Sequence, residues 1–131
     1  MRLLLDTHVA LWAIDGNPRL SAPIRALIMD ETNEVAVSAV SLWEIAIKFA
    51  RAKGRPNDMP FSGTQALAHF KDAGFALQSV SPEHAVAVDR LPRLHDDPFD
   101  RLLVAQALSE PLRLITHDAQ IAAYSDSVIY F

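Results

Sequence analysis

Short apolar runs alternate along this chain with longer segments in which apolar residues recur at helical spacing. The continuous runs predict strands at Leu3–Leu5, Val35–Ser38, Phe75–Val80, Leu112–Thr116 and Ser127–Tyr130. The periodic segments predict helices at Val9–Ile14, Ser21–Ile28, Val40–Ala52, Gln65–Ala73, Pro82–Leu91, Phe99–Ser109 and Ala119–Tyr124. Glycine and proline mark the turns between them, as in Gly16-Asn17-Pro18 and at Pro92.

This alternation of strands and helices predicts an α/β fold, with helices on both faces of a central, mostly parallel sheet. The 131 residues, half of them hydrophobic, suit one domain with a full core. No internal repeat or linker divides them, so we expect a single domain over residues 1–131. In open sheets of this kind, ligands bind at the carboxyl ends of the strands.

The helix predicted at Val40–Ala52 carries apolar residues on more than one face, which indicates that it is largely buried. Trp43 belongs to this pattern and Trp12 to that of the first helix. We therefore expect both rings in the core rather than at a base-stacking surface. The chain then becomes basic and breaks at Gly54 and Pro56, which predicts an exposed loop.

Carboxylates follow or face the carboxyl ends of the predicted strands. Asp6 ends the first strand, Glu44 lies in the first turn of the helix after the second, and Asp118 follows the fourth. Asp100 joins them if its helix begins there. A hard cation such as Mg²⁺ or Mn²⁺ prefers oxygen ligands and offsets the mutual repulsion of gathered acids. The sequence therefore predicts that these four acids hold a divalent metal.

Each acid also has a purely structural interpretation. Ser41 and Glu44 fit a capping box, in which the glutamate bonds back to the serine backbone. Asp97 and Pro98 form a good helix start, with Asp100 stabilised by the helix dipole. Asp118 can cap the next helix, and Asp6 can be a turn residue. Taken singly, these alternatives remain open, and convergence at one sheet edge favours the metal site.

Composition narrows the chemistry further. The chain has no cysteine, which excludes disulfides and thiolate sites, and its net charge of −4 argues against a general polyanion binder. No Gly-rich phosphate loop or Gly-x-Ser-x-Gly elbow is present. No apolar run has the length of a signal or membrane segment, so we expect a soluble, cytoplasmic protein. The candidates for a local basic rim that binds phosphate are Arg101, Arg51, Lys53 and Arg55.

The histidines carry a weaker signal than the acids. His95 and His117 adjoin proposed ligands and are candidates for substrate contact, but neither has a partner at helical metal-ligand spacing. We therefore interpret both as polar loop residues. Thr116 lies beside Asp118 and is a candidate to hold a water or a phosphate oxygen.

Several blocks together resemble the PIN domain, in particular its VapC branch of toxin ribonucleases. They span almost the whole chain in the right order, and the two most specific ones are Asp-Pro-Phe-Asp-Arg and Trp-Glu-Ile. The matching blocks are Leu4–His8 with Leu11-Trp12, Val37-Ser38, Ser41–Ile45, His95–Ala107 and Leu114–Asp118.

The resemblance implies a three-layer α/β/α PIN-like fold and Mg²⁺- or Mn²⁺-dependent endonucleolytic cleavage of RNA. It further implies a homodimer and a VapB-like antitoxin whose tail enters the acidic site. Carried over by position, the metal-binding and catalytic acids are Asp6, Glu44, Asp100 and Asp118, with Thr116 and Arg101 as candidate substrate contacts. The alternatives are an inactive partner-binding module of the same fold, and a DNA nuclease or RNA-processing enzyme that is not a toxin.

Overall fold

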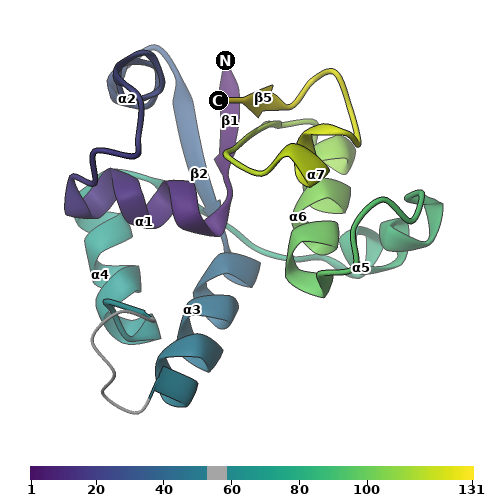
Figure 1. Cartoon of the computed structure of the whole chain (residues 1–131), viewed down its shortest axis with the longest axis horizontal. Helices are drawn as coiled ribbons and strands as arrows, with labels where there is room; N and C mark the ends of the chain where they lie inside the picture. Colours follow the sequence, from purple (N-terminus) through teal and green to yellow (C-terminus); the bar gives the residue numbers. More distant parts are fainter. Residues whose placement is uncertain (53–58) are drawn as a thin grey trace.

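A computed structural model describes residues 1–52 and 59–131 of the chain. Within these residues a five-stranded sheet has the order β3-β2-β1-β4-β5, and all neighbouring strands are parallel. The strands are β1 (Arg2–Leu5), β2 (Glu34–Ser38), β3 (Ala76–Gln78), β4 (Arg113–Thr116) and β5 (Ile129–Tyr130). The predicted α/β architecture is confirmed (Figure 1).

Helices connect the strands and cover both faces of the sheet. They are α1 (Thr7–Asp15), α2 (Ala22–Met29), α3 (Ala39–Ala52), α4 (Gly63–Asp72), α5 (Pro82–Ala87), α6 (Pro98–Ser109) and α7 (Ala119–Ala122), with a 3₁₀ turn η1 (Val88–Arg90) after α5. In Figure 1, α1, α2 and α4 lie on one side of the strands, and α5, α6 and α7 on the other. This arrangement is the predicted three-layer α/β/α sandwich.

The alternation of side chains along β1 shows how the two layers are built. Leu3 and Leu5 pack into a core cluster with residues of α1, α2 and α4, whereas Leu4 packs into a second cluster with Leu103 of α6. All three leucines of β1 are fully buried. A strand that is buried on both faces reads as a continuous apolar run, which is why the sequence revealed β1.

Several local predictions differ from the structure. The last helix ends at Ala122 instead of Tyr124, and the last strand begins at Ile129 instead of Ser127. The helix expected through Leu91 ends at Ala87 and continues as η1. The third strand is shorter than predicted, because β3 is an edge strand that pairs only with β2. Trp43 is not in the core: its exposed fraction is 59%, and it packs edge-on against Phe99 with 5.2 Å between the ring centroids. Trp12, by contrast, is buried as expected.

Two of the predicted basic-rim residues, Lys53 and Arg55, lie outside the described residues. Over the described ranges, 1–52 and 59–131, no helix has both the length and the apolar character needed to cross a membrane.

Candidate active site

Asp6 stands at the carboxyl end of β1 and begins α1. Its Oδ1 accepts a hydrogen bond from the backbone amide of Val9 at 2.9 Å, so it caps the helix, and its Oδ2 accepts one from the hydroxyl of Thr116 at 2.5 Å. Asp6 is 5% exposed. The sequence offered a turn as the structural role of Asp6, whereas the structure gives it the N-cap of α1. The cap uses one carboxylate oxygen, and the other faces Thr116 at the end of the neighbouring strand β4.

Glu44 projects from α3 and is 3% exposed. Its Oε1 lies 2.7 Å from the hydroxyl of Thr7, and its Oε2 lies 2.5 Å from the ammonium of Lys48. The capping-box alternative for Glu44 is wrong, because α3 begins at Ala39, so Ser41 already lies inside the helix. A buried carboxylate needs such partners, and Lys48 supplies a positive charge one turn further along α3.

Asp100 occupies the first turn of α6. Asp97 is the N-cap and accepts a hydrogen bond from the Asp100 amide at 3.0 Å, while Pro98 starts the helix. The predicted helix start is thus confirmed. It directs the Asp100 side chain toward His95, whose Nε2 lies 2.8 Å from Asp100 Oδ2.

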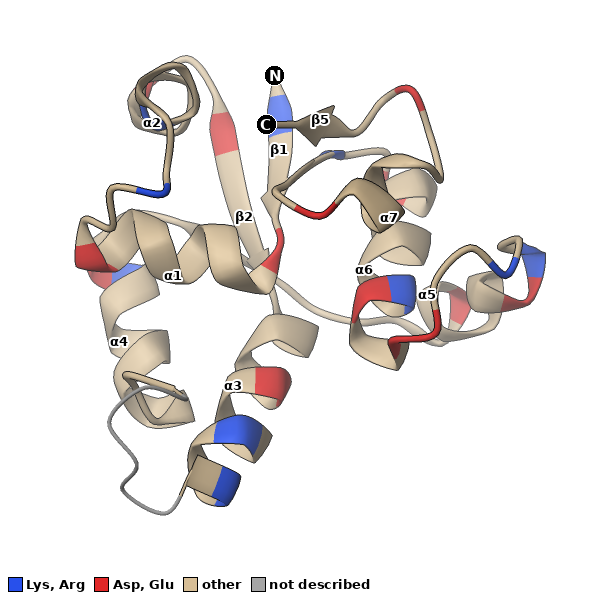
Figure 2. Ribbon diagram, viewed as in Figure 1, with Lys and Arg blue, Asp and Glu red and all other residues tan. Residues whose placement is uncertain are grey.

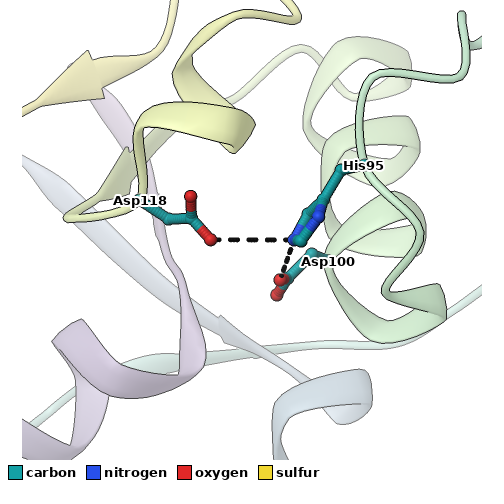
Figure 3. Close-up of side chains that lie close together, drawn as sticks. All are labelled: His95, Asp100 and Asp118. Carbon is teal, nitrogen blue, oxygen red and sulfur yellow. Dashed lines mark hydrogen bonds and ion pairs between the residues drawn. The ribbon is translucent and has the colours of Figure 1, made fainter.

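Asp118 follows β4 and precedes α7. Its Oδ1 caps α7 by accepting from the Gln120 amide at 2.8 Å, and its Oδ2 lies 3.6 Å from His95 Nε2. His95 therefore points between Asp100 and Asp118 (Figure 3). The sequence interpretation of His95 as an ordinary loop residue did not foresee this placement.

Short polar contacts link the four predicted acids. Thr7, next to Asp6, connects α1 to Glu44. The Thr116 hydroxyl donates to Asp6 and accepts from the Asp118 amide at 3.0 Å, and His95 joins Asp118 to Asp100. Figure 2 shows acidic positions after β1, on α3 and at the start of α6. Residues of α1, α3, α6 and β4, and of the segments before α1, α6 and α7, thus meet at the carboxyl ends of β1, β2 and β4.

The charges of this cluster perturb one another. Burial raises the pKa of Asp6, partly offset by its hydrogen bond to Thr116, and the charge of Glu44 adds to the increase. Burial also raises the pKa of Asp100 to about 6, with the His95 hydrogen bond opposing this and the charges of Asp97, Glu44 and Asp6 reinforcing it. A bound divalent cation relieves both the burial cost and the repulsion. The donor set, carboxylate oxygens and one imidazole, fits such an ion.

Arg101 and Thr116 are the two candidate substrate contacts from the sequence. The Arg101 guanidinium donates to the carbonyl oxygens of Pro92 and Val88 and to the hydroxyl of Tyr124, at 3.0, 3.4 and 3.1 Å. Thr116 is fully buried behind Asp6. The half-buried Arg101 thus holds the neighbouring segments together, and the buried Thr116 holds Asp6. These contacts favour a positioning role for both side chains over contact with RNA.

An open hollow of about 670 Å³ adjoins Asp6 and Asp118. Its lining also includes His8, Trp12, Arg19 and His117. The Arg19 guanidinium lies 5.9 Å from the centre of the Trp12 ring. It therefore places a positively charged side chain at the edge of this hollow. Arg51, the described member of the predicted basic rim apart from Arg101, is exposed in the last turn of α3. No sequence pattern indicated Arg19, because it lies in the turn after α1, away from the four predicted ligands.

Comparisons with known proteins agree with this fold. The family model described as the PIN domain matches residues 3–126. Ribonuclease VapC22 of Mycobacterium tuberculosis is 32% identical over 124 residues, which cover 93% of this chain and 91% of that protein. The chain therefore belongs to the PIN domain family, and the resemblance found in its sequence motifs is confirmed.

Solved structures show the same fold. A chain in the structure of VapBC2 from Rickettsia felis, bound to a DNA fragment from the promoter, has a TM-score of 0.70 at 17% identity and covers 100% of this chain and 98% of that one. A chain of DNA-bound VapBC from Salmonella typhimurium has a TM-score of 0.66 at 14% identity, with coverages of 100% and 97%.

Proposed function

We propose that this protein is a metal-dependent endoribonuclease and the toxin of a VapBC-like toxin-antitoxin pair. The observation that carries the proposal is the junction of Asp6, Glu44, Asp100 and Asp118, held together by Thr7, Thr116 and His95. The VapC-type ribonuclease that resembles the chain over most of its length supports the same activity.

The acids divide by burial. Asp6 and Glu44 are almost fully buried, whereas the side chains of Asp100 and Asp118 are 20% and 39% exposed. We assign Asp6, Glu44 and Asp100 to the principal cation, Mg²⁺ or Mn²⁺. Asp118, the most exposed, helps hold a second ion or orients the attacking water. When bound, such cations activate a water and neutralise charge on the phosphate.

The chain's own groups complete the reaction site. Thr116 fixes one oxygen of Asp6, and Asp97 fixes the helix turn that carries Asp100. The hollow beside Asp6 and Asp118 provides a route for the RNA strand, with Arg19 placed to contact a phosphate. Lys48 neutralises part of the charge of Glu44 at Oε2, the oxygen that does not bond to Thr7.

Chelation tests the proposal. A fluorescent single-stranded RNA should be cleaved in Mg²⁺ or Mn²⁺, and excess EDTA should lower the rate by about a hundredfold or more, because the acids alone cannot stabilise the reacting phosphate. Adding back the cation should restore cleavage. The same activity on a DNA strand of equal sequence would favour a DNA nuclease, and full activity in EDTA would contradict the metal-dependent mechanism.

The toxin assignment has its own consequences. As a VapC-type toxin the protein would act on RNA in the cytoplasm, form a homodimer, and be neutralised by a VapB-like antitoxin that occupies the acidic site. Induced expression of the wild-type chain should then arrest bacterial growth, and Asp6→Asn should relieve the arrest at equal protein level. Arrest by both chains would count against RNA cleavage as its cause.

A further inference from the structure

We propose that His95 is a nitrogen ligand of the ion that Asp118 helps hold, with Asp100 as the third ligand, and that this position consequently prefers Mn²⁺ over Mg²⁺. The inference rests on the proposed function and refines it by adding a ligand and by choosing between the two metals. It starts from the cluster of His95, Asp100 and Asp118, in which an imidazole nitrogen lies close to both carboxylates.

Three donor atoms from separate segments meet here. One oxygen each of Asp100 and Asp118 and one ring nitrogen of His95 all lie within 4.8 Å of one another. His95 Nε2 lies 2.8 Å from Asp100 Oδ2 and 3.6 Å from Asp118 Oδ2. Ligands about 2.1 Å from one ion stand about 3 Å apart when adjacent and about 4.2 Å apart when opposite. The two spacings from His95 Nε2, 2.8 and 3.6 Å, fall in the range that one cation requires.

A hydrogen bond explains only part of this arrangement. A neutral imidazole carries one N–H, which on Nε2 would bond Asp100 at 2.8 Å, whereas the 3.6 Å to Asp118 Oδ2 is longer than a hydrogen bond. Yet Figure 3 shows Nε2 directed into the space between Asp100 and Asp118. With the proton on Nδ1, the Nε2 lone pair points into the same space as both carboxylates, which is the donor arrangement of a metal-binding histidine.

Hydrogen bonds from Arg101 and Tyr124 hold the segment that carries His95. Arg101 bonds to the Pro92 and Val88 carbonyls and to the Tyr124 hydroxyl, and Tyr124 lies 3.5 Å from the His95 carbonyl oxygen. These bonds tie the segment to α6 and to the end of α7. The side chain of His95 is only 14% exposed. A ligand position held in this way loses little conformational entropy on binding.

A nitrogen donor changes which ion the site prefers. Mg²⁺ is hard and binds almost exclusively to oxygen, whereas Mn²⁺ also accepts imidazole. The carboxylate oxygens are suitable ligands for both ions. His95 therefore discriminates between them, and its replacement by an oxygen donor should reduce the preference.

Pulsed electron paramagnetic resonance of the Mn²⁺-loaded protein tests this directly. The wild-type spectrum should show the nuclear coupling of a directly bound ¹⁴N, and His95→Gln should abolish it. The same substitution should weaken Mn²⁺ binding about tenfold while changing Mg²⁺ affinity little. His69→Gln is the matched control, because His69 is exposed on α4, and it should keep the wild-type spectrum and affinities.

The outcomes separate the two proposals. Mn²⁺ bound without ¹⁴N coupling overturns the role of His95 and leaves the carboxylate site standing. Tighter Mn²⁺ binding in His95→Gln also overturns it, because His95 would then be an ion-pair partner that competes with the metal. Failure of the wild-type protein to bind Mn²⁺ contradicts the proposed function and the role of His95 together.

Discussion

Asp100→Asn should abolish RNA cleavage and at the same time stabilise the metal-free protein. Asparagine keeps the shape of the side chain but cannot bear the charge that binds the cation, so the rate should fall by about a hundredfold or more. Cleavage of the fluorescent RNA in Mn²⁺, with circular dichroism to verify folding, measures the first effect. A variant that folds and cleaves like wild type would exclude Asp100 from the metal site.

The stabilisation follows from the pKa of Asp100. Burial raises this pKa to about 6 in the folded protein, against about 3.9 in the unfolded chain. The folded state thus favours the protonated acid, and the resulting contribution to stability is present below about pH 4 and lost as the pH rises through 6. At neutral pH the charged carboxylate therefore weakens the metal-free fold, and asparagine removes this penalty.

Chemical denaturation in EDTA measures the second effect. One pKa unit corresponds to about 1.4 kcal/mol, and partial solvent screening reduces the gain, so we expect about 1 to 2 kcal/mol at pH 7.5. The difference should vanish near pH 4, where the wild-type acid is protonated too. Mn²⁺ should reverse the order, because the ion binds the wild type more tightly and therefore stabilises it more. Equal stabilities at every pH would show that Asp100 carries no such penalty.

Thr116→Val should impair both the fold and the reaction. Valine has the shape of threonine without its hydroxyl, so Asp6 loses a hydrogen bond while it stays buried, and the Asp118 amide loses its acceptor. Hydrogen bonds to a charged group contribute about 1.5 to 3 kcal/mol, and we expect a loss of stability of that size. The rate should fall about 10- to 100-fold, as for other residues that orient metal ligands.

The pH dependence distinguishes this role from simple loss of packing. The Thr116 hydrogen bond lowers the pKa of Asp6, so its removal should move the onset of metal-dependent cleavage to higher pH. Thr116→Ser keeps the hydroxyl and loses only a methyl group, and its pH profile should match wild type. If valine and serine shift the profile equally, the hydroxyl does not orient Asp6.

The positions of the acids could be predicted because they follow strong local signals. The buried run of β1 stops at Asp6, and Asp97-Pro98 is a strong helix start that fixes the place of Asp100. Capping leaves an oxygen free for the proposed ligation, since Asp6 and Asp118 each cap a helix with one oxygen and direct the other into the cluster. A capping role for Asp118 therefore does not compete with a role in metal binding.

The supporting residues could not be found in the same way. His95 lies in a segment without periodicity, and its place depends on the Arg101 and Tyr124 contacts, which join positions far apart in sequence. Trp43 has helical spacing, but that spacing does not show which apolar face of α3 meets the sheet. The place of His95 and the exposure of Trp43 depend on tertiary contacts, and local sequence patterns do not show these contacts.

Mn²⁺ binding to the wild-type protein and to Asp6→Asn, measured by isothermal titration calorimetry, tests most directly whether the gathered acids form a metal site. Asp72→Asn is the matched control, because it removes the same charge from an exposed position at the end of α4. We expect binding in the wild type and in the control, and an affinity at least about tenfold lower in Asp6→Asn. Equal affinities in all three proteins would contradict the proposed metal site.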